Sequence, residues 1–214
     1  YVVLAGRGTY DYKGVMGAGD NLVPPLMTST PRGLFVSDNR IVDLDEDGMP
    51  DMAIGRLPAV TVSELRVMID KIIAYEGAAP AAWQDDITLV ADIRDNGGDF
   101  EGASETVALQ APLGWSIERI YEGDIGIASA RSGIKTSLNT GTAFVNFFGH
   151  AGLDSMGDHG ILDATNMVEL TNSNRLPVVT AMTCVMGRYG VPDMNCLAET
   201  FVLNEGGGAV AVWS

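Results

Sequence analysis

The chain of 214 residues is poor in cysteine and in histidine, with two residues of each. Its cysteines, Cys184 and Cys196, allow one disulfide bridge at most, so a disulfide framework cannot hold the fold together. The spacing of the cysteines and histidines resembles no zinc finger or zinc ribbon, which argues against a structural zinc site. These few thiols and imidazoles are therefore candidates for chemistry.

Positive charge and long apolar runs are also scarce. Acidic residues outnumber basic ones 28 to 13, and the formal net charge of −15 disfavours nucleic acid and anionic membranes as partners. No apolar run reaches the roughly 18 residues that a membrane span needs. No basic segment followed by an apolar one opens the chain, so we expect no signal peptide in these residues. Hydrophobic residues still make up 46% of the sequence, enough for a filled core.

The sequence divides into two α/β halves. We expect an incomplete N-terminal subdomain over residues 1–78, a linker over 79–86, and a catalytic subdomain over 87–214 whose C-terminal end is missing. In the first half, apolar residues with a period of 3.6 predict a helix that ends at Gly77. Thr61 and Glu64 form a capping-box signature at its start.

The second half alternates regularly between strands and helices. Apolar runs and periodicity predict strands over 87–91, 116–121, 143–148, 176–183 and 209–212. Helices are expected over 104–113, 125–138, 164–171 and 195–203. This alternation predicts βαβ units and a mostly parallel sheet that helices cover on both faces.

Two of these predicted strands lead into residues with reactive side chains. One leads into Gly149 and His150, and the other leads into Thr183 and Cys184. Ligands of parallel sheets collect beyond the carboxyl ends of the strands, where an imidazole in reach of a thiol can accept its proton. Backbone N–H groups of Ala151 and Cys184 would then bind a developing oxyanion. We expect Gly149 and Thr183 to line the substrate site.

Each member of this pair also has a plain structural explanation. A lone cysteine is often a small buried residue, and a lone histidine is often a loop residue. Their joint position at the ends of two apolar strands favours catalysis. The other two residues of these types fit structural roles, because Cys196 lies on a predicted helix and His159 lies in a turn-like segment.

Three acidic residues follow the first strand of the second half. Asp92 ends the strand over 87–91 on the same side of the sheet as the pair, where it can orient His150 or line the cleft. Asp99 and Glu101 can add negative charge to a pocket for a substrate side chain. A solvated loop explains these acids equally well.

Alternate carboxylates in the first half resemble the beginning of a calcium loop. They are Asp43, Asp45, Asp47 and Asp51. Gly48 supplies the sharp turn, but Ile54 stands where a calcium loop has its bidentate glutamate. A structural Ca²⁺ site and a solvated acidic turn are equally good interpretations.

Taken together, several segments resemble the gingipain-type cysteine peptidases of peptidase family C25. They are the segments over 50–58, 143–150, 170–177, 183–187 and 197–201. Each motif alone is weak, whereas their order and spacing are specific. The resemblance implies a caspase-like fold, a three-layer α/β sandwich with two subdomains, the first incomplete. Ala151 departs from the glycine of the family, and Arg7 stands where many relatives have an aspartate.

The resemblance also implies an activity. Cys184 would be the nucleophile and His150 the base of a cysteine endopeptidase that works through an acyl-enzyme. Asp92 falls where arginine-specific members have a glutamate that orients the histidine. Glu101 is the best match to their acidic pocket residue, which implies a basic P1 preference. The chemistry requires no cofactor.

The expected partners are a protein or peptide substrate and further segments or chains of the same precursor. The resemblance also implies that the protein is secreted or lies at the cell surface. Two other functions remain open. The same pair would serve a secretion-associated signal peptidase or transpeptidase, in which an amine intercepts the acyl-enzyme. A non-catalytic binding module stabilised by calcium would share only the fold.

Overall fold

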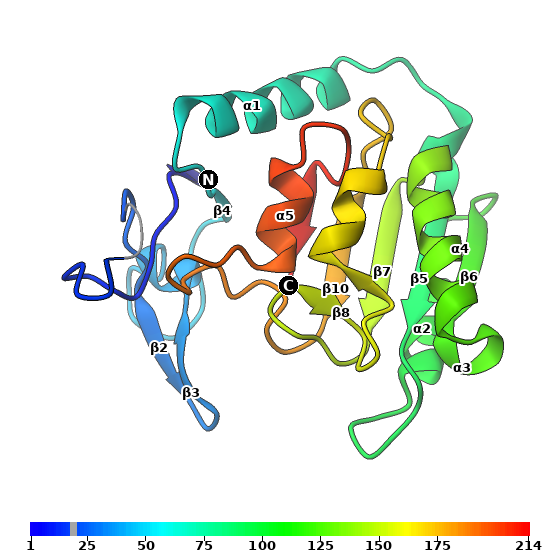
Figure 1. Ribbon diagram of the computed structural model, residues 1–214, viewed down its shortest axis with the longest axis horizontal. Helices are drawn as coiled ribbons and strands as arrows, with labels where there is room; N and C mark the ends of the chain where they lie inside the picture. The colour runs from blue at the N-terminus through cyan, green and yellow to red at the C-terminus, as the bar shows by residue number, and fades with distance from the viewer. Residues whose placement is uncertain (18–20) are drawn as a thin grey trace.

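A parallel sheet of five strands forms the centre of the computed structural model, which describes residues 1–17 and 21–214 (Figure 1). The strands lie in the order β11-β10-β7-β5-β6. Their bounds are β5 Asp86–Ala91, β6 Ser116–Tyr121, β7 Phe144–Phe148, β10 Val178–Met182 and β11 Ala211–Trp213. All four pairings are parallel. The mostly parallel sheet predicted from the sequence is confirmed.

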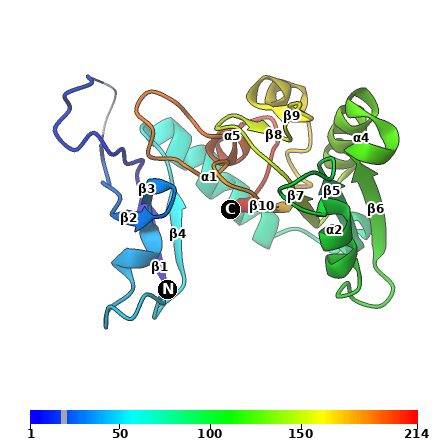
Figure 2. The same ribbon diagram turned by 90° about the horizontal axis from the view of Figure 1, so that it is seen from below.

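Helices cover both faces of this sheet (Figure 2). One face carries α4, η3 and α5, and the other carries α2; their bounds are Ile127–Thr140, Ala164–Glu169, Leu197–Leu203 and Phe100–Ala108. Alternate residues of β5 serve the two layers, because Val90 belongs to the large core and Leu89 to the smaller cluster on the α2 side. The expected three-layer sandwich is therefore present. Among the described residues, no helix has the length and apolar composition needed to cross a bilayer.

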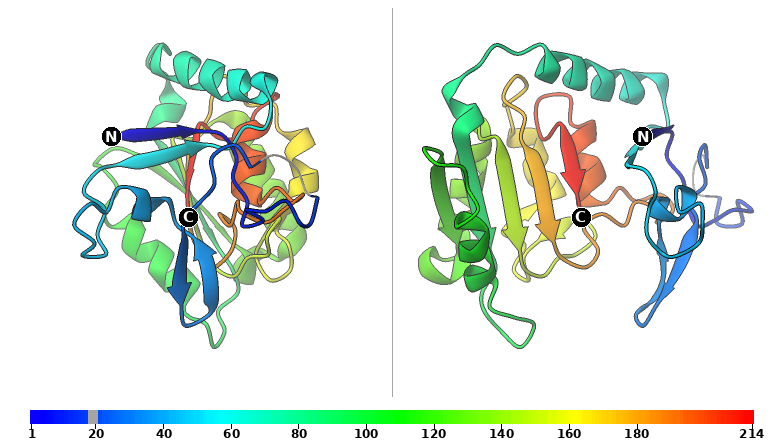
Figure 3. Two further views of the ribbon diagram at one scale, coloured as in Figure 1. Left: turned by 90° about the vertical axis from the view of Figure 1, so that its left-hand side faces the viewer. Right: turned by 180° about the vertical axis from the view of Figure 1, so that it is seen from behind.

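The N-terminal region lies beside the sheet and contains two small sheets of its own (Figure 3). β1 (Val2–Ala5) pairs in parallel with β4 (Ile54–Leu57), and β2 (Met27–Thr30) forms an antiparallel hairpin with β3 (Gly33–Val36). The 3-10 helix η1 (Asp38–Ile41) follows the hairpin. The sequence did not predict this hairpin, because its short strands lie in a stretch rich in glycine and proline.

The helix α1 (Val62–Glu76) confirms the expected cap. Thr61 Oγ1 accepts the Glu64 N–H at 3.2 Å, and the Glu64 carboxylate accepts the Thr61 N–H at 3.1 Å. Farther along, the Lys71 ammonium group donates to the carbonyls of Phe201 and Val202, at 3.2 and 2.9 Å. The helix thus anchors the N-terminal region to the end of α5. A 3-10 turn, η2 (Ala82–Asp85), then leads into β5.

Two predicted helices had wrong boundaries, since those expected over 104–113 and 125–138 are replaced by α2 and α4. The helix expected to begin at residue 104 begins at Phe100, because Asp99 caps it by accepting the Gly102 N–H at 3.0 Å. The helix expected over 125–138 is interrupted at Gly126, whose φ of 76° breaks it into α3 (Glu122–Ile125) and α4. A short hairpin, β8 (Ser155–Met156) and β9 (Leu162–Asp163), was also missed.

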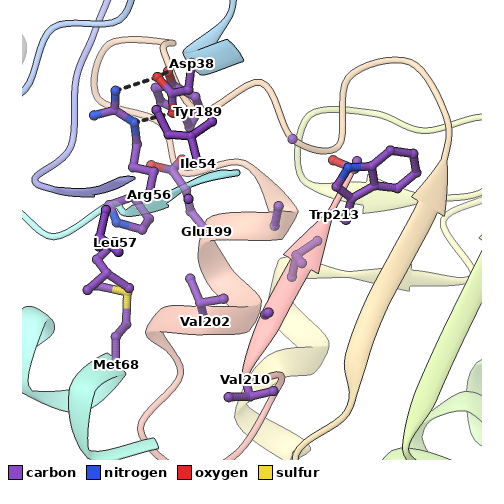
Figure 4. A pocket seen from close by; sticks show the side chains of 18 of the residues that line it. Asp38, Ile54, Arg56, Leu57, Met68, Tyr189, Glu199, Val202, Val210 and Trp213 are labelled. Carbon is purple, nitrogen blue, oxygen red and sulfur yellow. Dashed lines mark hydrogen bonds and ion pairs between the residues drawn. The ribbon is translucent and has the colours of Figure 1, made fainter. Parts of the chain in front are cut away.

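A pocket of about 710 Å³ separates the N-terminal region from the edge strand β11. Figure 4 shows part of its lining, which comes from β4, α1, α5 and β11 and includes Leu57, Met68, Val202 and Trp213. The lining is mainly apolar. Among the described residues, no continuous apolar core therefore joins the N-terminal region to the central sheet.

Candidate active site

Cys184 and His150 follow neighbouring strands of the central sheet. β7 and β10 pair in parallel with Phe148 opposite Met182, and the two residues lie two positions beyond these partners. The exposed thiol of Cys184 donates to the carbonyl of Ala151 at 3.5 Å. The structure therefore brings the thiol against the loop that carries the histidine. Neither residue lines the large pocket beside β11.

A close backbone approach explains the glycine before His150. A Cβ atom at Gly149 would lie 2.4 Å from Cβ of Asp92 and 2.6 Å from Cζ of Phe147. Any larger residue would push these groups apart. The sequence suggested that Gly149 leaves room for a substrate, whereas the close contact in the structure is with Asp92.

The His150 imidazole is held from two sides. Its Nε2 lies 3.0 Å from Asp95 Oδ2, and the Phe100 ring meets it edge-on at a centroid distance of 5.3 Å. The hydrogen bond to Asp95 is the main cause that raises the pKa of His150, and the charges of Asp158 and Asp92 add to it. Because Nε2 faces Asp95, Nδ1 is the ring nitrogen left to accept a thiol proton.

Asp92 holds the backbone around the histidine. It is 1% exposed, and its Oδ2 accepts the N–H groups of His150 and Asp158, both at 3.1 Å. The sequence assigned Asp92 to orient the imidazole, but the ring's hydrogen bond goes to Asp95. Asp92 is buried at the strand end and bonded to backbone N–H groups, whereas Asp95, three residues along the loop, reaches the ring.

The expected oxyanion donors lie beside the thiol. In the described part of the chain, the N–H groups of Ala151 and Cys184 donate no hydrogen bond, so both can bind an incoming oxyanion. Thr183 precedes Cys184, and its Oγ1 is buried without a hydrogen-bond partner among the described residues. The structure thus leaves two backbone N–H groups beside the thiol for a substrate oxygen, whereas the Thr183 hydroxyl, expected to line the substrate site, is buried.

The two acids expected in a substrate pocket differ in what they contact. Asp99 caps α2 and forms an ion pair with Arg94 at 3.0 Å, so its carboxylate is already engaged. Glu101 lies against α3, since a Cβ atom at Gly123 would be 2.8 Å from its Oε1. Burial is the main cause that raises the pKa of Glu101, and the charge of Asp124 adds to it. Glu101 is therefore the better candidate for a cationic substrate group.

Sequence reasoning missed three neighbours of the histidine: Asp95, Phe100 and Asp158. One signal was present, because Asp95-Asn96-Gly97-Gly98 is a typical turn sequence. In the structure the Asp95 N–H donates to the Gly98 carbonyl at 3.3 Å. This turn folds Asp95 back over the imidazole.

The acidic loop gathers three carboxylates. Oxygen atoms of Asp43, Asp45 and Asp47 lie within 4.8 Å of one another. Asp43 Oδ1 is buried without a hydrogen-bond partner among the described residues, and Asp51 Oδ2 accepts the Leu44 N–H at 2.8 Å. An all-oxygen donor set with one unsatisfied buried atom fits a hard cation such as Ca²⁺.

The chain is an α/β protein in which a thiol and an imidazole follow the carboxyl ends of two neighbouring parallel strands. The model of peptidase family C25 matches residues 1–214, so the chain belongs to this family. Its resemblance to the family is confirmed.

Gingipains of Porphyromonas gingivalis are among the curated relatives. The chain is 26% identical to Lys-gingipain HG66 over 185 residues, which cover 82% of this chain and 10% of that protein. It is 27% identical to gingipain R2 over 165 residues, which cover 73% and 22%. The chain thus spans at most about a quarter of the length of these relatives.

Solved structures show the same fold. The Arg-specific cysteine proteinase gingipain R (RGPB) matches with a TM-score of 0.79 at 21% identity, over 99% of this chain and 47% of that one. A complex of RgpB pro- and mature domains matches with a TM-score of 0.77 at 23% identity, over 99% and 48%. The caspase-like fold expected from the sequence is confirmed.

Proposed function

We propose that the chain supplies the catalytic site of a cysteine endopeptidase, with Cys184 as nucleophile and His150 as general base. The observation that carries this proposal is the position of the thiol, 3.5 Å from the carbonyl next to His150 at the ends of two paired strands. Membership of peptidase family C25 supports it.

In the proposed mechanism, Nδ1 of His150 takes the thiol proton and the thiolate attacks the peptide carbonyl carbon. The N–H groups of Ala151 and Cys184 stabilise the negative oxygen of the tetrahedral intermediate. The imidazolium then gives its proton to the departing amine, which leaves an acyl-enzyme. Water, activated by the same imidazole, hydrolyses the thioester and restores the thiol.

The two cysteines allow an internal control. Cys184 is exposed, whereas Cys196 is buried and burial raises the pKa of its thiol to about 12. We expect iodoacetamide to alkylate Cys184 alone and to abolish peptide cleavage, as Cys184→Ala does, while Cys196→Ala keeps it. Equal labelling of both thiols, or full activity of Cys184→Ala, would refute the proposal.

Asp95 is proposed as the residue that orients and polarises the imidazole. Its hydrogen bond raises the pKa of His150, which extends the thiolate–imidazolium pair to higher pH. We expect Asp95→Asn to move the alkaline limb of the pH profile of peptide cleavage to lower pH, because the imidazolium that protonates the departing amine is lost earlier. Asp99→Asn, which removes a carboxylate from the same loop, serves as control. An unchanged profile in Asp95→Asn would assign the role to another group.

A basic P1 residue is proposed because Glu101 is partly buried and carries a carboxylate. Relatives are named Lys-gingipain and Arg-specific cysteine proteinase, which supports this choice. We expect arginine or lysine reporters to be cleaved at least tenfold faster than a norleucine reporter, and Glu101→Gln to reduce this ratio. Adding an amine acceptor to the assay distinguishes hydrolysis from transpeptidation.

A structural Ca²⁺ ion is proposed in the acidic loop, held by Asp43, Asp45 and Asp47. The unsatisfied buried oxygen of Asp43 supports it. We expect Ca²⁺ to raise the melting temperature and Asp45→Asn to remove this effect. Glu46→Gln, which removes a charge from the same loop without touching the cluster, should retain it. A calcium effect unchanged in Asp45→Asn would place the ion elsewhere.

Further segments of the same precursor are proposed to pack into the pocket beside β11. The protein is also proposed to be secreted or displayed at the cell surface. The apolar lining of the pocket and the largely exposed Trp213 support the packing of further segments there. Hydrogen exchange of β11 should slow in a longer version of the chain that contains these segments. Fractionation of the cells that produce the protein tests the proposed location.

A further inference from the structure

A second cluster of ligand-type side chains lies on the other side of Asp92. Asp92 and Glu122 follow the paired ends of β5 and β6, where Ala91 stands opposite Tyr121. His159 reaches them from the turn between β8 and β9. One ligand atom from each of these three residues lies within 4.8 Å of the others.

The buried Glu122 carboxylate in this cluster has one oxygen atom without a partner among the described residues. It is 3% exposed, and its Oε1 contacts His159 Nδ1 at 2.9 Å. Its Oε2 is buried and has no hydrogen-bond partner among the described residues. An ionised carboxylate oxygen that is buried without a donor is costly, so it requires a proton or a cation beside it. The neighbouring Asp92 carboxylate adds a second negative charge to the same space.

We propose that Asp92, Glu122 and His159 form a binding site for a transition-metal dication of the zinc type. One imidazole and two carboxylates are a donor set that zinc accepts, whereas calcium prefers oxygen ligands alone. In a tetrahedral site with bonds of about 2.1 Å, the ligand atoms stand about 3.4 Å apart. His159, whose side chain is 57% exposed on its turn, can make this adjustment.

The metal would tie three separate segments together. It would connect the ends of β5 and β6 to the turn that carries His159, and this turn already donates the Asp158 N–H to Asp92. Asp92 also accepts the His150 N–H, so the site adjoins the catalytic histidine. The imidazole of His150 takes no part in it. Metal binding can therefore be measured independently of peptidase activity.

Zinc titration by calorimetry tests the proposal, with melting temperature as a second measurement. We expect one Zn²⁺ ion to bind the 214-residue chain and stabilise it. Glu122→Gln and His159→Gln should each weaken binding by at least about tenfold. The exposed His159 makes its variant the safer one for folding. Asp124→Asn, which removes a charge from the same helix without touching the cluster, should bind like the parent.

A nearby alternative is excluded by another variant. Asp95, His150 and Asp158 form a more exposed group of the same type. Asp95→Asn should leave zinc affinity unchanged if the ion binds at Glu122. The proposal fails if the chain binds no zinc, if both Glu122→Gln and His159→Gln bind it as tightly as the parent, or if Asp95→Asn alone loses it.

Discussion

The N-terminal region and the central sheet are stabilised by different kinds of contact. Residues 87–214 build a continuous apolar core under α4, η3 and α5, with a smaller cluster under α2. In residues 1–17 and 21–78, the buried apolar side chains are only Val42, Ala59, Met68 and the prolines Pro25 and Pro58. Such a set cannot form a core of its own.

Buried cationic side chains, rather than an apolar core, hold the N-terminal region against the rest of the protein. Arg7 donates to the Glu199 carboxylate at 2.9 Å and to the carbonyls of Val191 and Met194. Arg56 forms two hydrogen bonds to Asp38, at 2.8 and 2.7 Å. Apolar packing tolerates imprecise shapes, whereas a buried charge needs its partner in place. The N-terminal region is therefore positioned by paired charges, each of which a single substitution can break.

The largest expected effect is in the core. Phe147 is fully buried in the large apolar cluster, so Phe147→Ala should cost about 3–5 kcal/mol of unfolding free energy. Urea unfolding measures it. Leu113→Ala, at a fully exposed position, should stay within about 0.5 kcal/mol. If the two variants lose similar stability, the sheet region does not depend on its core.

Removal of one buried cation should cost nearly as much. Arg7→Met leaves the Glu199 carboxylate, which is 2% exposed, without its counter-charge. We expect a loss of about 3 kcal/mol in urea unfolding and faster proteolysis of the N-terminal region.

A second substitution tests the cause. In the double variant Arg7→Met/Glu199→Gln, no charge is left buried, and the amide oxygen can still accept the Cys196 N–H that caps α5. Most of the lost stability should return. If the double variant is no more stable than Arg7→Met, lost packing rather than the unpaired charge explains the loss.

The contrast between the regions also explains what the sequence could predict. The strands that end at Phe148 and Met182 are short apolar runs, so the positions of His150 and Cys184 at one sheet edge followed from pattern and topology. The Thr61 and Glu64 cap is local and was confirmed. Local signals and buried strands are therefore readable from a single sequence.

Long-range polar contacts were not predictable in the same way. The role of Asp95 depends on a turn that folds it over the ring, and the sequence assigned that role to Asp92 instead. Glu122 was missed, although it directly follows a predicted strand, because its meaning depends on which strand lies beside β6. Arg7 and Glu199 are 192 positions apart, and no local pattern connects them.

A smaller effect concerns the third buried cation. Burial lowers the pKa of Lys71 to about 8 from an ordinary value of 10.5. The unfolded chain therefore binds more protons between these pH values, so the stability contributed by Lys71 rises with pH across this window and becomes independent of pH well below 8. Relative to Lys71→Met, the parent should gain on the order of 2 kcal/mol from pH 8 to 10.5. Lys13→Met, at an exposed position, should show no such trend.

The smallest effect is expected for an ion pair of the same type on the surface. Arg119 donates to Glu105 through two nitrogens, at 2.6 and 3.1 Å, and together with the Tyr121 hydroxyl it lowers the pKa of Glu105 to about 2. Both side chains are nearly half exposed, so water and salt screen the pair. Arg119→Gln should cost about 0.2–1 kcal/mol in urea unfolding, less at high salt, and less again as pH falls from 4.5 towards 2. A loss as large as that of Arg7→Met would show that pairing, and not burial, sets the strength of these contacts.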